Sequence, residues 1–283
     1  MAKFELLYQL LLKQNLIQHD QIHIPLSISR SDLERIHTRR YHEAFSLDRL
    51  SRPEQRRIGL PATRPLVQRT WLAVGGTLLT ARLALQQGLA CHLAGGTHHA
   101  HQDFGSGFCI FNDCAVAARV LLDRGEAHNI LIVDLDVHQG DGSASCFKDD
   151  QRVTTLSVHA ASNFPLRKVS GDVDIALADG TGDDEYLGAI GDRLPEMLEQ
   201  IRPDLVLFNA GVDPHRDDRL GRLALSDDGL LKRDRLVLDA CLRRQIPTAT
   251  VIGGGYDAIE PLVNRHSIVI RAAIEQARLF ALA

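Results

Sequence analysis

The sequence has few cysteines, no excess of basic residues and no long apolar run, and each absence narrows its class. Its five cysteines form no Cys-x-x-Cys pair and no even framework, so we expect reduced thiols in a cytoplasmic protein. A net charge of −4 and a pI near 6.3 favour neither nucleic acid nor an anionic membrane as a partner. No apolar stretch is long enough to span a bilayer.

What remains is an ordinary globular composition, with 45% hydrophobic and 24% charged residues among 283. A chain of this length buries a large core, and α/β folds commonly reach this size as one unit. We therefore predict one catalytic domain over residues 1–283. Its oligomeric state is left open.

Predicted strands and helices alternate along most of the chain, which indicates an α/β fold with a parallel sheet and helices on both faces. Apolar and β-branched runs predict strands at 90–94, 130–136, 153–158, 173–177, 205–208 and 248–252. Apolar spacing predicts helices at 3–14, 40–58, 66–88, 112–124, 143–148, 183–200, 226–244 and 258–280. A capping-box pattern, Ser31-Asp-Leu-Glu34, predicts one more short helix.

The stretch Ile130–Gly142 carries the clearest functional signal. Asp134, Asp136 and His138 follow a buried strand at every second position, so on an extended backbone they would share one face. An unpaired buried carboxylate is costly, and a divalent metal is an economical way to compensate it. We therefore expect metal chemistry at the end of this strand.

Other loops that follow strands should meet at the same rim, where ligands of parallel α/β sheets bind. Taken alone, Asp213 before Pro214 indicates an Asx-turn, and the pair His98-His99 is equally compatible with a surface loop. The glycines at 253–255 are not followed by Lys-Ser/Thr, which excludes a Walker loop. A shared functional site is favoured, because otherwise a turn, a surface loop and a glycine turn would have to occur independently at the same edge of the sheet.

The candidate metal ligands are Asp136, His138 and Asp213. Three protein ligands with an open fourth position are typical of a catalytic zinc site. Ligands without cysteine suit Zn²⁺, and Fe²⁺ or Co²⁺ could substitute for it.

The remaining polar groups fit metal-assisted amide hydrolysis. A catalytic histidine needs an orienting carboxylate, and the pairs His98–Asp134 and His99–Asp141 meet that need. The metal polarises the carbonyl and lowers the pKa of bound water, one histidine takes the water proton, and a histidine protonates the leaving amine. Tyr256 would donate a hydrogen bond to the oxyanion.

Six motifs in family order resemble the zinc-dependent histone deacetylase superfamily, which has an arginase-like α/β fold. The resemblance extends from about residue 30 to the C-terminus. Three features are most similar to the class IV branch and its bacterial relatives: Gln139, the Asp218–Leu223 motif and Gly182–Leu187. The motifs are Gly95-Gly-Thr-His-His-Ala100, Gly105-Ser-Gly-Phe-Cys-Ile-Phe-Asn-Asp113, Asp134-Leu-Asp-Val-His-Gln-Gly-Asp-Gly142, Asn209-Ala-Gly-Val-Asp213, Asp218-Arg-Leu-Gly-Arg-Leu223 and Gly253-Gly-Gly-Tyr256.

The resemblance implies one Zn²⁺ per chain on the three ligands named above, and the same two histidine pairs with Tyr256. It implies an acylated lysine or a small acyl amide as substrate. The substrate-binding residues that it implies are Gly107, Phe108, Phe164, Leu220 and Gly254. It also implies a structural K⁺ or Na⁺ near Asp134, Asp136, His138, Ser157 and Val158.

One departure from the family concerns the start of the chain. Members of the superfamily usually begin with a strand and a loop containing His-Pro and Arg-Phe-Pro, before a helix like the one expected here at 3–14. We therefore expect this first strand and part of the pocket rim to be absent, with every proposed zinc ligand retained.

Three alternatives to an N-acyl-lysine deacylase remain. An acetylpolyamine hydrolase would use acidic groups at the mouth, for which Asp217 and Asp218 are candidates. An arginase-like ureohydrolase is disfavoured, because the order here is Asp-x-Asp-x-His and residue 140 is Gly. A non-catalytic acyl-lysine binder is disfavoured by the intact histidines and Tyr256.

Overall fold

The computed structural model describes residues 2–282, whose centre is a six-stranded sheet, so the two end residues of the predicted domain lie outside the description. The strands are all parallel and are ordered β1-β6-β5-β2-β3-β4, which confirms the predicted parallel sheet. They are β1 Leu89–Cys91, β2 Ile130–Asp134, β3 Val153–Ala160, β4 Val173–Leu177, β5 Leu205–Asn209 and β6 Thr248–Val251.

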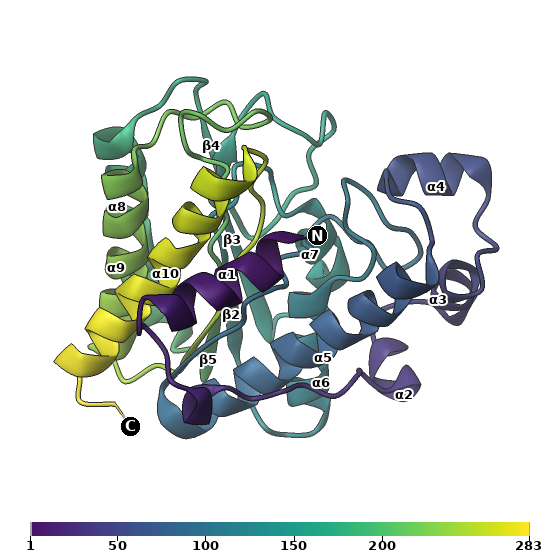
Figure 1. The fold of residues 1–283 in the computed structure, drawn as a ribbon, viewed down its shortest axis with the longest axis horizontal. Coiled ribbons are helices and arrows are strands. Elements are labelled where there is room, and N and C mark those ends of the chain that lie inside the picture. Colours follow the sequence, from purple (N-terminus) through teal and green to yellow (C-terminus); the bar gives the residue numbers. More distant parts are fainter. Residues whose placement is uncertain (1, 283) are drawn as a thin grey trace.

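Helices cover both faces of this sheet (Figure 1). They are α1 Ala2–Lys13, α2 Arg30–Leu33, α3 Arg39–Ser46, α4 Arg52–Ile58, α5 Arg64–Gln87, α6 Asp113–Asp123, α7 Asp141–Phe147, α8 Asp183–Ile201, α9 Asp227–Leu242 and α10 Ile259–Leu279, with a 3₁₀ turn at His19–Gln21. None of the helices within 2–282 is both long and apolar enough to cross a lipid bilayer.

Alternation along β2 explains why both faces are covered. Leu131 and Val133 pack into one apolar cluster with α1, α8, α9 and α10, whereas Ile130 and Ile132 pack into a second cluster with α5 and α6. All four side chains are buried, as expected for the central strand of a parallel sheet.

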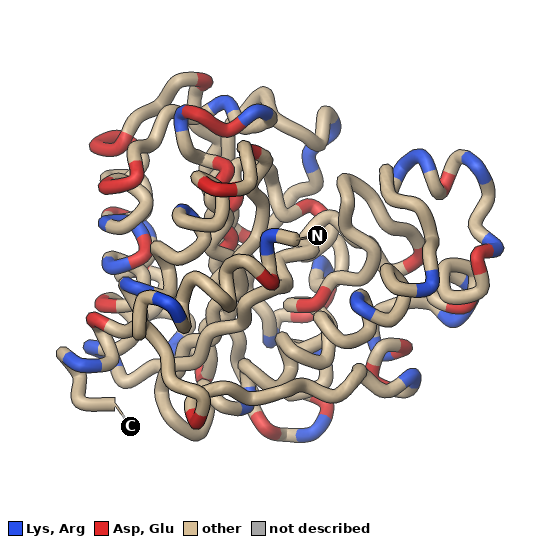
Figure 2. The backbone as a smooth tube through the Cα atoms, viewed as in Figure 1, with Lys and Arg blue, Asp and Glu red and all other residues tan. Residues whose placement is uncertain are grey.

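Acidic residues gather around the loops at the upper left of the molecule, where α8 and α9 begin (Figure 2). The first turn of α8 contains Asp183, Asp184 and Glu185, and that of α9 contains Asp227 and Asp228. Negative charge at a helix N-terminus is favourable because it faces the positive end of the helix dipole.

Two helix predictions were wrong in detail. The helix expected at 40–58 is divided into α3 and α4, because Asp48 adopts a left-handed φ of 53° and Ser51 caps the second helix. The residue that caps α2 is Ser29, whose Oγ accepts from the Asp32 amide at 3.1 Å, and not Ser31 of the predicted capping box.

The central strand is also shorter than predicted, ending at Asp134 instead of residue 136. Asp134 Oδ1 accepts a hydrogen bond from the Asp136 amide at 3.2 Å, and Asp136 Oδ1 accepts one from the His138 amide at 3.0 Å. Carboxylates that bond the backbone two residues ahead form Asx-turns. Asp136 and His138 are therefore brought together by consecutive turns and not by the alternation of a strand.

Candidate metal centre and histidine pairs

Asp136, His138 and Asp213 form a buried cluster at the carboxyl ends of β2 and β5, with one ligand atom of each within 4.8 Å of the others. His138 Nδ1 lies 2.9 Å from Asp136 Oδ1 and 3.2 Å from Asp213 Oδ2. The three residues predicted as ligands therefore converge on one point.

Two neighbouring amides hold the carboxylates in place. The Val137 amide donates to Asp213 Oδ1 at 2.9 Å, and the Gly254 amide donates to Asp136 Oδ2 at 2.8 Å. A Cβ at Gly254 would lie 2.1 Å from Asp213 Oδ2 and 2.6 Å from Asp136 Oδ2. Glycine is needed at 254 because its backbone passes directly against both carboxylates.

The cluster fits a divalent cation. Asp213 Oδ2 is buried and makes no well-directed hydrogen bond within residues 2–282, although His138 Nδ1 lies 3.2 Å away. A buried carboxylate oxygen is costly unless it is compensated. Burial and the adjacent Asp136 charge raise the pKa of Asp213 to about 7. Two carboxylates and one imidazole are a donor set that a zinc-type ion accepts.

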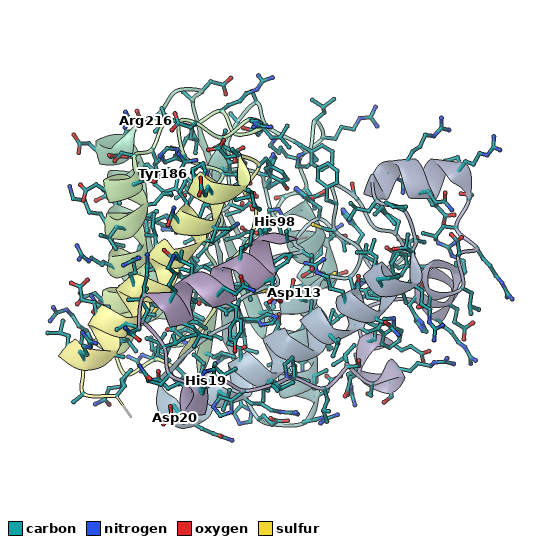
Figure 3. All side chains as sticks on the ribbon, in the orientation of Figure 1. His19, Asp20, His98, Asp113, Tyr186 and Arg216 are labelled. Atoms are coloured by element: carbon teal, nitrogen blue, oxygen red, sulfur yellow. The ribbon has the colours of Figure 1, made fainter. Side chains whose placement is uncertain are left out.

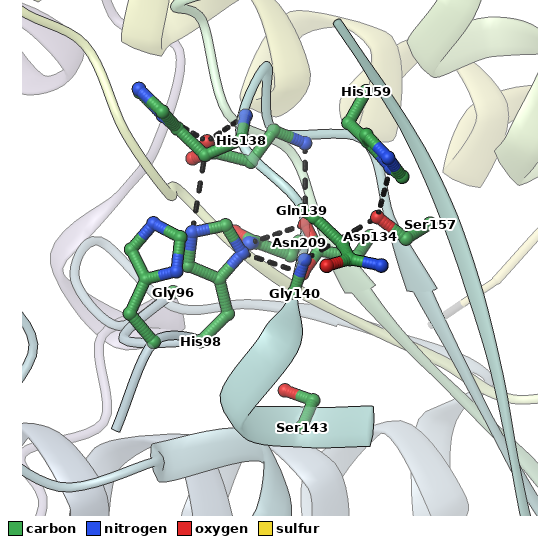
Figure 4. Close-up of polar contacts among 12 residues, drawn as sticks. Gly96, His98, Asp134, His138, Gln139, Gly140, Ser143, Ser157, His159 and Asn209 are labelled. Carbon is green, nitrogen blue, oxygen red and sulfur yellow. Dashed lines mark hydrogen bonds and ion pairs between the residues drawn. The ribbon is translucent and has the colours of Figure 1, made fainter. Parts of the chain in front are cut away.

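His98 and Asp134 form the first predicted pair, with His98 Nδ1 2.6 Å from Asp134 Oδ2 (Figure 4). The amide of Asn209 holds the carboxylate, because its Nδ2 donates to Asp134 Oδ1 at 2.8 Å. Burial alone would lower the pKa of His98, but Asp134 and Asp136 outweigh it and raise this pKa to about 9. His98 therefore favours its charged form when no cation is bound.

His99 and Asp141 form the second pair, with His99 Nδ1 2.5 Å from Asp141 Oδ1. Burial and the neighbouring His98 lower the pKa of His99 to about 4, against the pull of Asp141, so the ring is neutral near pH 7. The other Asp141 oxygen lies 3.1 Å from His101 Nε2, a partner that the sequence did not predict. Asp141 thus serves two histidines.

The N-terminus of α6 fixes the backbone of the His98–His99 loop. The Asp113 carboxylate accepts from the Gly96 amide at 3.1 Å and from the Thr97 amide at 2.8 Å. Asn112 Nδ2 donates to the His98 and Ala100 carbonyls, each at 3.2 Å. Figure 3 labels His98 and Asp113 near the middle of the molecule. Both holding residues lie in a quoted motif, but the sequence did not reveal their partners.

Tyr256 follows the glycine loop and faces the cluster. Its ring centroid lies 6.0 Å from that of His138 and 5.9 Å from that of Phe108. The Tyr256 amide donates to Asp218 Oδ2 at 2.7 Å, which anchors its backbone. Burial, followed by the charges of the nearby aspartates, raises the pKa of Tyr256, so its hydroxyl remains a hydrogen-bond donor.

The residues predicted to contact substrate lie around His99 and Tyr256. The Phe164 ring meets the His99 ring edge-on with 4.8 Å between centroids. A Cβ at Gly107, which has a φ of 52°, would lie 2.7 Å from His99 Cδ2. Phe108, Phe164 and Leu220 remain 40–46% exposed, as expected for side chains that line an opening.

Two side chains tie the Phe164 loop to the rest of the site. Gln139 Nε2 donates to the Val169 carbonyl at 2.7 Å, and Gln139 Oε1 accepts from the Val169 amide at 3.0 Å. Asn163 Nδ2 donates to the Leu220 carbonyl at 2.7 Å. From the sequence, Gln139 was noted only as a family variant. In the structure it holds the backbone of the Phe164 loop at Val169.

The residues named for a monovalent cation lie on β2, on β3 and in the loop that follows β2. Asp134 is in register with Ser157, and Val158 is next along the strand. The Ser157 Oγ lies 3.0 Å from His159 Nδ1 (Figure 4). The adjacency of Asp134, Ser157 and Val158 is compatible with a cation site, which remains a prediction.

The chain is similar to known proteins along nearly all of its length. The family model described as "Histone deacetylase domain" matches residues 1–271. An uncharacterized protein of Picosynechococcus sp. is 52% identical over 274 residues, which are 96% of this chain and 91% of that protein. The acetoin utilization protein AcuC of Staphylococcus aureus is 30% identical over 300 residues, covering 97% of this chain and 76% of AcuC.

Two further similarities are more limited. Histone deacetylase 2 of Arabidopsis thaliana is 35% identical over 186 residues, which are 65% of this chain and 48% of that protein. The crystal structure of the HDA15 HD domain has a TM-score of 0.81 at 21% identity, covering 97% of this chain and 81% of that one. At that identity the structure supports a common fold.

Proposed function

This chain belongs to the histone deacetylase family and is a deacetylase hydrolase, and on that premise we propose that it hydrolyses N-acyl-lysine-type amides with a single Zn²⁺. Asp136, His138 and Asp213 would hold the ion. The observation that carries the proposal is the buried convergence of these three side chains, in which Asp213 Oδ2 lies 3.2 Å from His138 Nδ1 and close to Gly254. We propose further that residues 1–283 act as one catalytic domain, because one sheet supports every loop of the site.

A bound Zn²⁺ polarises the scissile carbonyl and lowers the pKa of water. The chain supplies the proton transfers. His99 is neutral near pH 7, and Asp141 holds its Nδ1, so Nε2 is left as the proton acceptor. His98, whose Nδ1 lies 2.6 Å from Asp134 Oδ2, is the other histidine of the site, and we assign to it the proton that the leaving amine takes up.

Tyr256 supplies the hydrogen bond to the oxyanion. Its raised pKa keeps the hydroxyl protonated, and the bond between its amide and Asp218 fixes the backbone from which it projects. A donor positioned before the reaction stabilises developing charge without reorganisation.

We propose an acyl-lysine-type substrate over an acetylpolyamine because the candidate acidic groups at the mouth already have partners. Asp218 Oδ1 accepts from the Leu220 and Gly221 amides, each at 2.9 Å, and its Oδ2 accepts from Tyr256. Asp217 Oδ2 accepts from Arg265 Nη2 at 2.9 Å. Carboxylates that already accept hydrogen bonds or pair with an arginine attract a polyamine less than free carboxylates would.

A monovalent cation beside the zinc site is a further part of the proposal. We place K⁺ or Na⁺ between β2 and β3, near Asp134, Asp136, His138, Ser157 and Val158, because these residues are adjacent in register or sequence. Such an ion would stiffen the loop that carries two of the three zinc ligands.

The decisive experiment combines metal analysis with turnover of a fluorogenic acetyl-lysine peptide. Tyr256→Phe should bind one Zn²⁺ like the wild type and lose about 100- to 1,000-fold in kcat, the scale of one lost oxyanion donor. Asp136→Ala should lose the metal and the activity together. Unchanged turnover in both variants would refute the assignment, and faster turnover of acetylputrescine than of the peptide by the wild type would favour the polyamine alternative.

A further inference from the structure

Arg233 of α9 lies beneath the candidate metal centre and takes no part in the chemistry described above. Its side chain is fully buried, with 0% exposed. Its Nη1 donates to the Gly211 carbonyl at 2.6 Å and to the Leu135 carbonyl at 3.2 Å. One guanidinium nitrogen therefore joins two separate loops.

These two carbonyls lie immediately before the candidate ligands. Leu135 precedes Asp136 by one residue, and Gly211 precedes Asp213 by two. The β2–β5 ladder reaches the Asp134–Asn209 pair and then the bond from the Leu135 amide to the Asn209 carbonyl at 3.1 Å. Arg233 adds a link between the same two loops closer to the ligands.

The surroundings of Arg233 make a purely stabilising role a poor explanation. Its charge is balanced by the adjacent Asp234, with Arg233 Nε 2.9 Å from Asp234 Oδ1, and both residues are buried. Among the described residues 2–282, Asp234 Oδ2 has no hydrogen-bond partner. A buried ion pair is often no more stabilising than apolar residues of similar volume, because both charges lose their water. Stability alone therefore does not explain a guanidinium group at position 233.

A second side chain strengthens the same contact. The Tyr186 hydroxyl donates to the Leu135 carbonyl at 3.3 Å, so this oxygen accepts from both α8 and α9. Figure 3 labels Tyr186 on α8, on the side of the molecule that α9 also occupies. The helices on this face thus hold the main chain of the ligand loop directly.

We propose that Arg233 is a positioning residue that sets the separation of the two ligand-bearing loops and thereby the affinity for the metal. The inference rests on the proposed metal site and extends it to a residue outside the ligand set. Arginine suits the task because its planar group presents several donors in a fixed geometry, whereas lysine presents a single flexible point charge. Interactions that orient metal ligands typically change affinity by 10- to 100-fold.

The test is Arg233→Lys, with Zn²⁺ affinity measured by competition against a chromophoric chelator. We expect binding about 10- to 100-fold weaker than in the wild type. The Co²⁺-loaded protein provides a second readout, because Zn²⁺ is d¹⁰ and its geometry is spectroscopically silent. The Co²⁺ d–d bands should shift in position or intensity when the loops separate.

Arg119→Lys is the matched control. Arg119 is a mostly buried arginine of α6 with a carboxylate partner, Asp150, at 2.6 Å, and its described contacts lie away from the ligand loops. Its Zn²⁺ affinity and Co²⁺ spectrum should stay unchanged even where its Tm falls. Such a result separates ligand positioning from the general cost of replacing an ion-paired arginine that is largely buried.

A second variant removes the ion pair without leaving a lone buried charge. The double replacement Arg233→Met with Asp234→Leu should keep the Tm of the metal-free protein near that of the wild type while still weakening Zn²⁺ binding. Affinity within twofold of the wild type in both this variant and Arg233→Lys, with an unchanged Co²⁺ spectrum, overturns the inference. Failure of the wild type to bind zinc would instead overturn the proposed function.

Discussion

The candidate ligands and the residues around the opening differ sharply in their surroundings. Asp213, Asp136 and His138 are 0%, 1% and 6% exposed, whereas Phe108 and Phe164 are 46% and 40% exposed. The ligands directly follow central strands, and ladder bonds and glycine contacts restrain them. The side chains at the opening project from long loops on the surface.

This difference indicates a division of tasks. The buried cluster tolerates little change, because any shift moves a carboxylate against Gly254 or away from its amide donor. The opening can vary, because each exposed side chain contributes mainly its own apolar contact. Replacements in the buried cluster should therefore abolish metal binding and activity, whereas replacements at the opening should change substrate binding by degrees.

The largest expected effect follows Asp213→Asn. The variant should bind Zn²⁺ more than about 100-fold more weakly. Losing even a residue that only orients a metal ligand typically lowers metal affinity 10- to 100-fold. The Tm of the metal-free protein should stay the same or rise, because burial and the adjacent Asp136 already disfavour the charged form of the Asp213 carboxyl. Metal analysis and thermal unfolding of the metal-free protein measure the two effects. A metal-free variant much less stable than the wild type would show that the cluster serves the fold.

A smaller effect is expected at the opening. Phe164→Ala should raise KM roughly tenfold for an acetyl-lysine peptide, the scale of a lost apolar contact in a pocket. Leu220→Ala should raise KM by no more than about threefold and leave kcat unchanged, because no contact with His99 is lost. Steady-state kinetics with saturating zinc separates the constants. A loss of bound metal in either variant would break the proposed division between the two regions.

The smallest effect concerns His37, which contacts the backbone on both sides of the loop between His101 and Asn112. Its Nε2 accepts from the Asn112 amide at 2.9 Å, its Nδ1 lies 3.0 Å from the His101 carbonyl, and burial lowers its pKa to about 3. In the unfolded chain His37 binds a proton as the pH falls through about 6.5, whereas in the folded protein it stays neutral. The contribution of His37 to stability is therefore complete above pH 6.5 and is lost progressively below it.

The free energy of unfolding should therefore fall by about 1.4 kcal/mol per pH unit below 6.5 on account of His37 alone. Urea unfolding of metal-free His37→Gln at pH 6.5 and 5.5 should show a correspondingly shallower fall than the wild type. Exposed His19→Gln is the control and should follow the wild type. Equal slopes in all three proteins would mean that His37 is protonated without loss of the fold.

Local patterns in the sequence predicted the sheet and the ligand cluster because both depend on residues close together in the chain. The apolar run Ile130–Val133 is buried on both sides and forms the central strand, as expected. The grouping of Asp136 with His138 held although its stated cause was wrong, since Asx-turns and strand alternation both bring such residues together. The family resemblance was confirmed by the match over residues 1–271.

Contacts between distant segments could not be predicted in this way. Arg233 sits in an ordinary helical pattern, and nothing nearby indicates that it reaches the carbonyls of Leu135 and Gly211. The second partner of Asp141, His101, depends on the path of a loop without regular structure. Both interactions involve side chains whose partners are fixed only by the packing of the whole domain.

The candidate ligands come from the loops that follow β2 and β5, and this has a consequence for how the protein is made. His138 leaves the ribosome well before Asp213 and Gly254, and at 5–20 residues per second the interval to Gly254 is on the order of ten seconds. During that time the first two ligands are present without the third and without the glycine loop that closes over them. If the proposed site selects its metal by geometry, that selection can begin only after synthesis of β6 and of the glycine loop that follows it.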